Sequence, residues 1–412
     1  PAGMVRIVIP ANSDVLVALP FNAFSPGIHS VFSNQLTGAT NEISADKVSQ
    51  WDINLQEYKN AHKADLTGDP DKDGKWFVDF TGWSTSTLEF YPGQGFWIRN
   101  NQSTTQTVFL SGTLVIDASM INSFVNGFTL FSYPFSSALK INNSQMYTNG
   151  AYADSTSSNA DAIHSWDRDL QNYIHYGLKD SDGKWRFATN WAGSAVEDFM
   201  EIGKGYTYER KLSNAFTWAE SRPYENLFPG NTEPPKIVSM QVNSNRDEVT
   251  LVIECLGAAG ETLDIFYKDL SSTNAFTSTG WKTAATNLPA SGQQSISWTD
   301  QGTENRGKID MVYARYFLVG RADIDSDGDG IANARETFIY DTDPNDPDSL
   351  PRAFISGAIS YSGSLTGIVK VLAATNSSSW DAAYSSTLSL PGAYSITNVP
   401  LFRNYWLKAY RD

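Results

Sequence analysis

An internal duplication is the feature that most constrains what this 412-residue chain can fold into. Residues 44–58 and 159–173 are identical at seven of 15 aligned positions, including a shared Trp-Asp-x-x-Leu-Gln-x-Tyr segment. Three further blocks recur in the same order: Leu19-Pro20-Phe21 with Tyr133-Pro134-Phe135, Asp73-Gly74-Lys75-Trp76 with Asp182-Gly183-Lys184-Trp185, and Gly93-Gln94-Gly95 with Gly203-Lys204-Gly205. The sequence therefore predicts two copies of a domain of about 110 residues, copy 1 at 1–115 and copy 2 at 116–233.

Both copies are predicted to be β domains. Their apolar residues fall in short alternating runs rich in Val, Phe, Trp and Tyr, bounded by turn-forming residues, and no segment sustains a helical period. The Asp-Gly pairs at 73–74 and 182–183 are typical of tight hairpin turns. The repeated Gly-x-Gly lacks the third glycine and the helix of a phosphate loop, so we expect a turn or bulge before a strand.

Three tryptophans of copy 1, Trp51, Trp76 and Trp97, admit two interpretations. They could form a sugar-stacking platform, or they could belong to the core. Because Trp51 and Trp76 recur in copy 2, core packing is the better account, and Trp51→Ala is then expected to cost about 3–5 kcal/mol. Trp83 and Trp191 lie among Gly, Ser and Thr, and are expected to be exposed and free to stack on sugars if the chain binds them.

A different pattern begins at Pro234-Pro235, which reads as a linker. Five strands are expected in a sandwich at 234–322: Ile237-Val238, Val249–Ile253, Leu263–Tyr267, Ser295–Trp298 and Val312–Val319. With Tyr316-Phe317-Leu318-Val319 as a Tyr-centred penultimate strand, this segment resembles a fibronectin type III-like domain. The resemblance concerns the architecture alone.

The strongest chemical motif lies at residues 325–336, which fit the calcium-loop pattern Asp-x-Asp-x-Asp-Gly-x5-Glu without a gap. Carboxylates spaced by two residues share one side of a tight turn, Gly330 supplies the bend, and ligation by oxygen alone selects Ca2+ over zinc. The alternative is a solvated acidic linker without a bound ion. The predicted ligands are Asp325, Asp327, Asp329, the carbonyl of Ile331, Asn333 and Glu336.

The residues around this loop differ from those of an EF-hand, because the segment before it reads as a strand. The pattern Asp-x-Asp-x-Asp-Gly-x-x-Asn-x-x-Glu, followed by Thr342-Asp343-Pro344-Asn345-Asp346-Pro347-Asp348, resembles a thrombospondin type 3-like repeat. That resemblance implies a calcium-stiffened connector, which we place at 323–351.

The last segment, 352–412, alternates at period two throughout. Its Gly392-Ala393-Tyr394 precedes Ile396-Thr397-Asn398-Val399-Pro400, and in this it resembles a carboxypeptidase regulatory-like (Cna-B-type) β-sandwich. The combination of modules is similar to multidomain surface or secreted proteins of bacteria, which implies a secreted or cell-surface location.

The amino-acid composition excludes several classes of binding partner and of chemistry. Thirty basic against 45 acidic residues give a net charge of −15 with no Lys/Arg-rich run, so no nucleic acid is expected. No apolar run approaches the 18 residues of a membrane span, so no membrane insertion is expected. The single cysteine, Cys255, excludes an internal disulfide and a thiolate metal cluster, and four histidines leave little general-base capacity.

The fold class predicted is all-β, with tandem β-sandwich-type domains and one short calcium-binding acidic connector. We expect no enzyme activity but a calcium-stiffened extracellular structural or adhesive protein, or one segment of a fibre. A carbohydrate-binding accessory region of a polysaccharide-degrading protein is the alternative, with surface glycans as partners. A glycosidase, which needs two carboxylates across a cleft, is the third class of protein compatible with the sequence.

Self-assembly is the other partnership expected. The strands at Met4–Pro10 and Tyr405–Tyr410 place an unprotected edge at each end of the chain, which would recruit a second copy by head-to-tail strand addition. In the alternative, Val5–Ile9 pairs within its own domain and the protein is a monomeric string.

Overall fold

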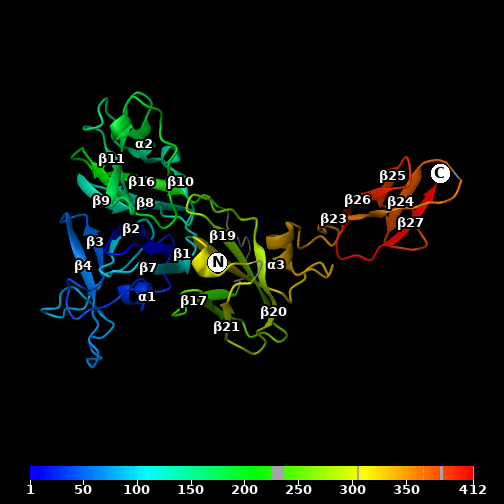
Figure 1. The fold of residues 1–412 in the computed structure, drawn as a ribbon, viewed down its shortest axis with the longest axis horizontal. Helices are drawn as coiled ribbons and strands as arrows, with labels where there is room; N and C mark the ends of the chain where they lie inside the picture. The colour runs from blue at the N-terminus through cyan, green and yellow to red at the C-terminus, as the bar shows by residue number, and fades with distance from the viewer. Residues whose placement is uncertain (225–234, 304–305, 365, 381–383, 412) are drawn as a thin grey trace. The chain divides into compact units, whose positions relative to one another are not determined.

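A computed structural model describes residues 1–224, 235–303, 306–364, 366–380 and 384–411. They form two compact units, 1–320 and 321–412, so the unit boundary lies two residues from the one expected at 322–323. The predicted all-β class is confirmed: antiparallel sheets make up both units, and the helices are single turns (Figure 1). None of the helices described has the length and apolar character needed to cross a membrane.

The two copies contain equivalent five-stranded sheets. In copy 1 the order is β2 (Asp14–Ala18), β6 (Gly95–Arg99), β3 (Lys47–Asp52), β4 (Glu57–Lys63) and β5 (Trp76–Phe77). In copy 2 it is β9 (Gly127–Phe131), β15 (Tyr206–Arg210), β11 (Ala162–Asp167), β12 (Asn172–Lys179) and β13 (Lys184–Phe187). Trp51 pairs with Tyr58 and Trp166 with Tyr173, so the repeated segment occupies the same hairpin in both copies. Equal strand order is what the duplication predicts.

Short elements complete the copies. The helices are α1 (Ile28–Phe32) in copy 1, and η1 (Ile141–Asn143), α2 (Met146–Asn149) and η2 (Ala188–Asn190) in copy 2. Two two-stranded sheets pair β8 (Ser119–Phe124) with β16 (Phe216–Ser221), and β10 (Leu139–Lys140) with β14 (Phe199–Met200).

The N-terminal strand β1 (Ala2–Ile9) lies inside a sheet. It pairs with β7 (Gln106–Thr113) along its whole length and with β22 (Ala314–Arg321) over Ala2–Val5. The expectation of an unprotected strand edge at the N-terminus is therefore wrong, because this strand has a partner on both sides. One partner belongs to copy 1 and the other to the predicted sandwich, so the first three predicted domains share one unit.

The predicted sandwich contains two sheets. One is β17 (Lys236–Val242), β18 (Val249–Glu254) and β21 (Ser295–Asp300); the other continues from β1 through β22 to β19 (Thr262–Leu270) and β20 (Lys282–Pro289). A 3-10 turn, η3 (Ile309–Met311), precedes β22. All five expected strands are present, and β20 was missed because its side chains are mostly exposed and only weakly apolar. Ala2 and Met4 of β1 pack into the same core as Leu251 and Phe317.

The second unit begins with the acidic loop, which leads into α3 (Asn333–Arg335) and a π-helical turn, η4 (Glu336–Tyr340). The following sandwich pairs β23 (Arg352–Ala358) with β26 (Ala393–Pro400) and arranges β25 (Tyr384–Leu388), β24 (Val369–Ala374) and β27 (Trp406–Arg411) in a second sheet. Within the described residues β27 pairs with β24 alone, so the C-terminal strand is an edge, as expected. The core of this sandwich is small: Val369, Val371, Ala373, Ile396 and Val399.

Candidate functional site

The acidic loop gathers three of the predicted ligands. Carboxylate oxygens of Asp325, Asp327 and Asp329 all lie within 4.8 Å of one another. Oxygens of these carboxylates also accept backbone N–H groups of the loop itself: Gly330 donates to Asp325 Oδ2 at 2.9 Å and Ile331 to Asp329 Oδ1 at 2.7 Å. The sequence folds this way because short acidic side chains bond to the backbone two to five residues ahead and so fix a tight turn.

Glu336 is the most informative member of the loop. Its side chain is fully buried, and its Oε2 lacks a hydrogen-bond partner within the described structure. Burial raises the pKa of this carboxyl to about 7, and the nearby Asp327 and Asp329 act in the same direction. The second oxygen accepts the hydroxyl of Thr342 at 3.1 Å, a contact from outside the predicted loop that spacing alone did not reveal.

Two aspartates share this condition. Asp327 Oδ2 and Asp329 Oδ2 are buried and, like Glu336 Oε2, lack a hydrogen-bond partner in the described part of the chain. Buried polar atoms are nearly always paired, so three unpartnered carboxylate oxygens in one loop have the chemistry expected of ligands for a cation. An all-oxygen donor set of this kind fits a hard cation such as Ca2+.

The remaining predicted ligands are placed differently. The Asn333 side chain bonds to Ser326 twice, accepting its backbone N–H at 2.8 Å and donating to its hydroxyl at 2.7 Å. Ile331 is 3% exposed, so its side chain anchors the loop while its backbone follows the turn. The structure thus brings the three aspartates together, buries Glu336, and uses Asn333 to hold the start of the loop.

A second cluster of functional interest lies where the two copies meet. The Trp51 indole N–H donates to the backbone oxygen of Phe128 in copy 2 at 2.8 Å. The Gln56 side chain donates to the same oxygen at 3.0 Å and accepts the Phe128 N–H at 2.9 Å. One Trp and one Gln of copy 1 therefore hold a single peptide group of copy 2.

Copy 2 returns the same contact. Trp166 Nε1 donates to the backbone oxygen of Asp14 at 2.9 Å, and Gln171 both donates to that oxygen and accepts the Asp14 N–H at 3.0 Å. We call this reciprocal set of six residues the clasp. It relates the copies by a local pseudo-twofold, and its Trp and Gln both come from the repeated segment.

The repeated Gly-x-Gly lies in the same junction. Lys204 forms an isolated β-bridge with Val17, and Gln94 forms the equivalent one with Phe131. A Cβ on Gly205 would lie 2.6 Å from the backbone oxygen of Val17, closer than any side chain tolerates. The turn expected at this motif is present, and its glycines allow the two copies to approach.

These contacts correct the interpretation of the tryptophans. Trp76 and its equivalent Trp185 are core residues, 0% and 2% exposed, as predicted. Trp51 and Trp97 are only partly buried and lie at the junction, so the expectation of core packing is wrong for them. Trp83 is also half-buried and stacks on Phe80 at 4.8 Å.

Trp191 is also half-buried, and its indole N–H donates to the backbone oxygen of Ser155 at 2.7 Å. The expectation that Trp83 and Trp191 are exposed is therefore wrong.

The clasp predicts a modest stability effect. Trp51→Ala is expected to lower the free energy of unfolding of residues 1–320 by about 1–2 kcal/mol, because one hydrogen bond and a partly buried ring are lost. Trp76→Ala, in the core, is expected to cost about 3–5 kcal/mol. Urea unfolding followed by circular dichroism measures both. Equal losses for the two variants would restore the core interpretation of Trp51.

An open cleft adjoins the clasp, with a volume of about 400 Å3. We call it the junction cleft; its lining residues are Asp14, Lys47, Ser49, Tyr58, Asn60, Trp97, Trp166 and Tyr173. Trp97 packs edge-to-face on Trp166 at 5.1 Å, and Tyr173 packs on Trp166 at 4.9 Å. Both copies therefore contribute aromatic rings to it.

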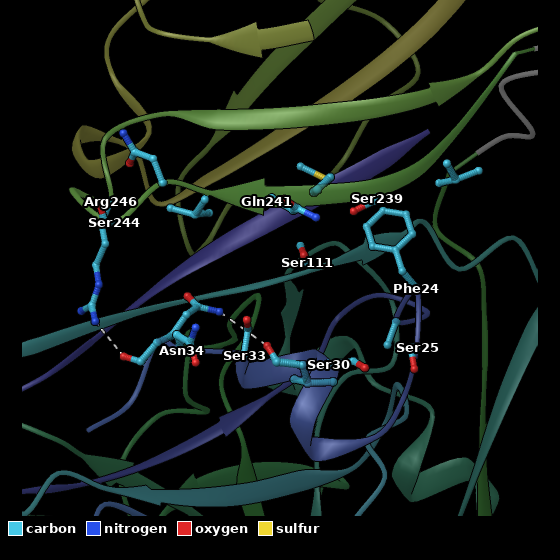
Figure 2. A pocket seen from close by; sticks show the side chains of 17 residues that line it. Phe24, Ser25, Ser30, Ser33, Asn34, Ser111, Ser239, Gln241, Ser244 and Arg246 are labelled. Carbon is cyan, nitrogen blue, oxygen red and sulfur yellow. Dashed lines mark hydrogen bonds between the residues drawn. The ribbon is translucent and has the colours of Figure 1, made fainter. Parts of the chain in front are cut away.

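A larger hollow of about 800 Å3 lies between β17 and the segment around α1 (Figure 2). Figure 2 shows Arg246 at one end and Phe24 at the other, with serine, asparagine and glutamine side chains between. The Arg246 guanidinium is already held, since it donates to the backbone oxygens of Thr107 at 2.6 Å and Gln35 at 2.7 Å. Among the described residues lining this hollow there is no carboxylate, imidazole or thiol, so it offers no general base.

Two histidines of copy 2 form a closed pair. His164 Nδ1 lies 2.6 Å from His175 Nδ1, and His164 Nε2 lies 3.3 Å from a carboxylate oxygen of Glu209. Burial, reinforced by the neighbouring His175, lowers the pKa of His164 to about 4. His164 is therefore neutral at physiological pH, with both ring nitrogens engaged.

Comparison with known protein families and with curated proteins gives no match. Among solved structures, the chain is similar to one described as a tetra-tandem repeat in the extending region of a large adhesion protein, at 11% identity over 97% of this chain and 99% of that one. The TM-score is 0.12, so this similarity carries no argument about fold or function.

Proposed function

We propose that this chain is a non-catalytic, calcium-stiffened structural or adhesive protein, secreted or displayed on a bacterial surface. The observation that supports this most is the unpartnered, fully buried Glu336 Oε2 beside Asp327 and Asp329. A cation at that point would be bound by Asp325, Asp327, Asp329 and Glu336, with Ile331 and Asn333 completing the loop. It would neutralise the repulsion among the carboxylates and stiffen the connector at 323–351.

Two features favour a structural role over catalysis. The His164–His175 pair is closed and its first member is neutral, so it is not poised as a general base. The hollow between β17 and α1 is lined by neutral polar and apolar side chains and by one arginine whose guanidinium is already hydrogen-bonded. Both features are compatible with a protein that binds a partner or acts as a spacer between other parts, rather than with an enzyme.

Calcium binding is the test of this proposal. Titration calorimetry of the whole chain is expected to show saturable calcium heat that is lost in Asp327→Ala/Glu336→Ala. Asp117→Ala/Glu254→Ala removes the same charge from exposed positions of the first unit and is expected to bind as the parent does. An unchanged titration of the loop variant, or no calcium heat at all, would contradict the site.

Self-assembly by strand addition remains part of the proposal in a narrower form. The N-terminal strand is paired on both sides over Ala2–Val5, so of the two terminal strands β27 offers the longer free edge. Exposed side chains of Trp406 and Leu407 lie on that strand. Light scattering and electron microscopy with calcium and with chelator test it; monodisperse monomers in both conditions would end the assembly idea without affecting the calcium site.

A second candidate function, carbohydrate binding, is favoured by one observation. The junction cleft places four aromatic side chains, Tyr58, Trp97, Trp166 and Tyr173, beside polar groups. Of the tryptophans that the sequence offered for sugar stacking, Trp97 lines this cleft, whereas Trp83 and Trp191 lie outside it. Any glycan site is therefore expected at the junction of the two copies rather than at these two tryptophans.

A further inference from the structure

We propose that the junction cleft is a binding site for a neutral saccharide. This inference deepens the second candidate function and rests on it, while it is independent of the calcium loop, which belongs to the other unit. The cleft exists only because the copies are joined, since copy 1 supplies Tyr58 and Trp97 and copy 2 supplies Trp166 and Tyr173.

The aromatic side chains of the cleft are fixed in advance. Trp97 donates its indole N–H to the Tyr58 hydroxyl at 3.2 Å, and Trp166 donates to the Asp14 backbone oxygen at 2.9 Å. The two indoles meet at an interplanar angle of 82°, and both are only partly buried. The exposed faces of the two indole rings are therefore apolar, held in a fixed orientation and accessible to solvent. The C–H face of a sugar ring packs on a surface of this kind.

Polar groups border these rings. Ser49 donates its hydroxyl to Asn60 Oδ1 at 2.7 Å, which orients the amide and leaves its NH2 group as a donor. Asp14 is held by Arg99 at 2.9 Å through one oxygen, so the other oxygen remains an acceptor, and Lys47 adds a cation. Donors and acceptors beside apolar rings match the hydroxyl groups and C–H faces of a saccharide, and a volume of about 400 Å3 is in the range of small-ligand sites.

Proline-rich peptides are the other ligands that dock on aromatic grooves. Their carbonyls need hydrogen-bond donors between the rings, and both indole N–H groups here are already used within the protein. The donors that remain in the lining are the Tyr58 hydroxyl, the Asn60 amide and the Lys47 ammonium group. The saccharide is therefore the favoured occupant, and a peptide is an outcome of the test.

The duplication supplies an internal comparison. Strand register makes Thr207 the equivalent of Trp97 and His164 the equivalent of Ser49. His175 stands where copy 1 has Asn60, as the partner of His164 across the hairpin. The position in copy 2 that corresponds to the junction cleft therefore lacks the indole of Trp97. The closed His164–His175 pair takes the place of Ser49 and Asn60 there.

Binding rather than hydrolysis follows from the acids present. Asp14 is the only carboxylate among the residues described as lining the cleft, and it is paired with Arg99. A glycosidase needs two carboxylates flanking the bond that it cleaves. The cleft is thus equipped to hold a sugar and not to cleave it.

The experiment is a neutral-glycan array with the whole chain in chelator, followed by calorimetry with the best oligosaccharide among cello-, chito-, xylo- and manno-hexaose. Chelator throughout separates this result from the calcium site. Trp97→Ala and Asn60→Ala are each expected to weaken binding at least tenfold. Thr207→Ala at the equivalent position, Trp83→Ala and Trp191→Ala are expected to bind within about twofold of the parent.

Unfolding curves and circular dichroism show that each variant is folded, and Asn60→Ala keeps the test valid if Trp97→Ala is destabilised. The inference is overturned if no neutral saccharide binds, if the Trp97 and Asn60 variants bind as the parent does, or if binding is lost in Trp83→Ala or Trp191→Ala instead. Binding of a polyproline peptide at the cleft, without saccharide binding, would also overturn it.

Discussion

Replacing Asp161 with asparagine is expected to lower the free energy of unfolding of residues 1–320 by about 3–5 kcal/mol. Asp161 and Arg210 form a buried ion pair at 2.6 Å, with side chains 0% and 1% exposed. The same carboxylate accepts the Tyr208 hydroxyl and the backbone N–H groups of Tyr152 and Lys211. Removing its charge leaves a buried guanidinium without a counter-ion, which is the costly way to break such a pair.

The duplication again provides a matched control. Asp46 is the equivalent buried aspartate of copy 1, where Asn100 stands in place of Arg210 and Gln106 donates to the carboxylate at 2.7 Å. Asp46→Asn leaves no guanidinium without its paired carboxylate, and the buried Lys63 nearby keeps its hydrogen bond to the Ser33 backbone oxygen, so a smaller loss of about 1–3 kcal/mol is expected. Arg210→Met added to Asp161→Asn is expected to recover part of the loss.

Urea unfolding followed by tryptophan fluorescence measures these differences. Equal losses in Asp46→Asn and Asp161→Asn, or no recovery in the double variant, would show that the charge pair is not the source of the effect.

Calcium is expected to raise the free energy of unfolding of residues 321–412 by about 4 kcal/mol when its concentration is about a thousand times the dissociation constant. The core cluster of the sandwich in this unit has five buried apolar side chains, and the loop region buries Ile331 and Phe338 of its own, so the loop is a large part of what holds the unit together. Tyr340, at the end of η4, packs edge-on against Phe402 of the sandwich at 5.6 Å. Ordering of the loop therefore reaches the sandwich within the same unit.

Differential scanning calorimetry of the whole chain measures this effect. Calcium is expected to move the transition of residues 321–412 upward by about 15–30 °C and to leave that of residues 1–320 in place. Glu336→Ala assigns the transition, because its calcium response should vanish. A shift confined to the first unit, or an equal shift in the variant, would contradict the prediction.

Local patterns in the sequence predicted local structure well. The predicted ligands at 325–336 are contiguous in sequence, so their proximity depends little on the rest of the fold. Three of the carboxylates lie close together as predicted. The duplicated blocks predicted two equivalent sheets, and Trp76 and Trp185 are in the core as expected. Each of these features depends on residues close together in the chain or on a pattern repeated within it.

The recurrence of a tryptophan in both copies does not tell whether it lies in the core of each copy or at the contact between them. A residue that makes a pseudo-twofold contact recurs in both copies just as a core residue does, so Trp51 and Trp166 gave the same signal as Trp76 and Trp185. The junction cleft stayed hidden for a related reason, because Trp97 has no aromatic counterpart at Thr207. Its rings come together only through the pairing of the copies, which no spacing in the sequence records.

The position of β1 has a consequence in time. Its partner β22 begins 312 residues after β1 does, at Ala314 against Ala2. At translation rates of about 5–20 residues per second, β1 would wait about 15–60 s for that partner to be synthesised. During this interval its edge next to β7 is satisfied and the other is not, so the nascent chain carries an open strand that a chaperone, or a neighbouring chain on the same polysome, is able to reach. The sheet is completed only when residues 314–321 leave the ribosome. The first strand of the unit therefore gains its second partner in one of the last steps of the unit's folding.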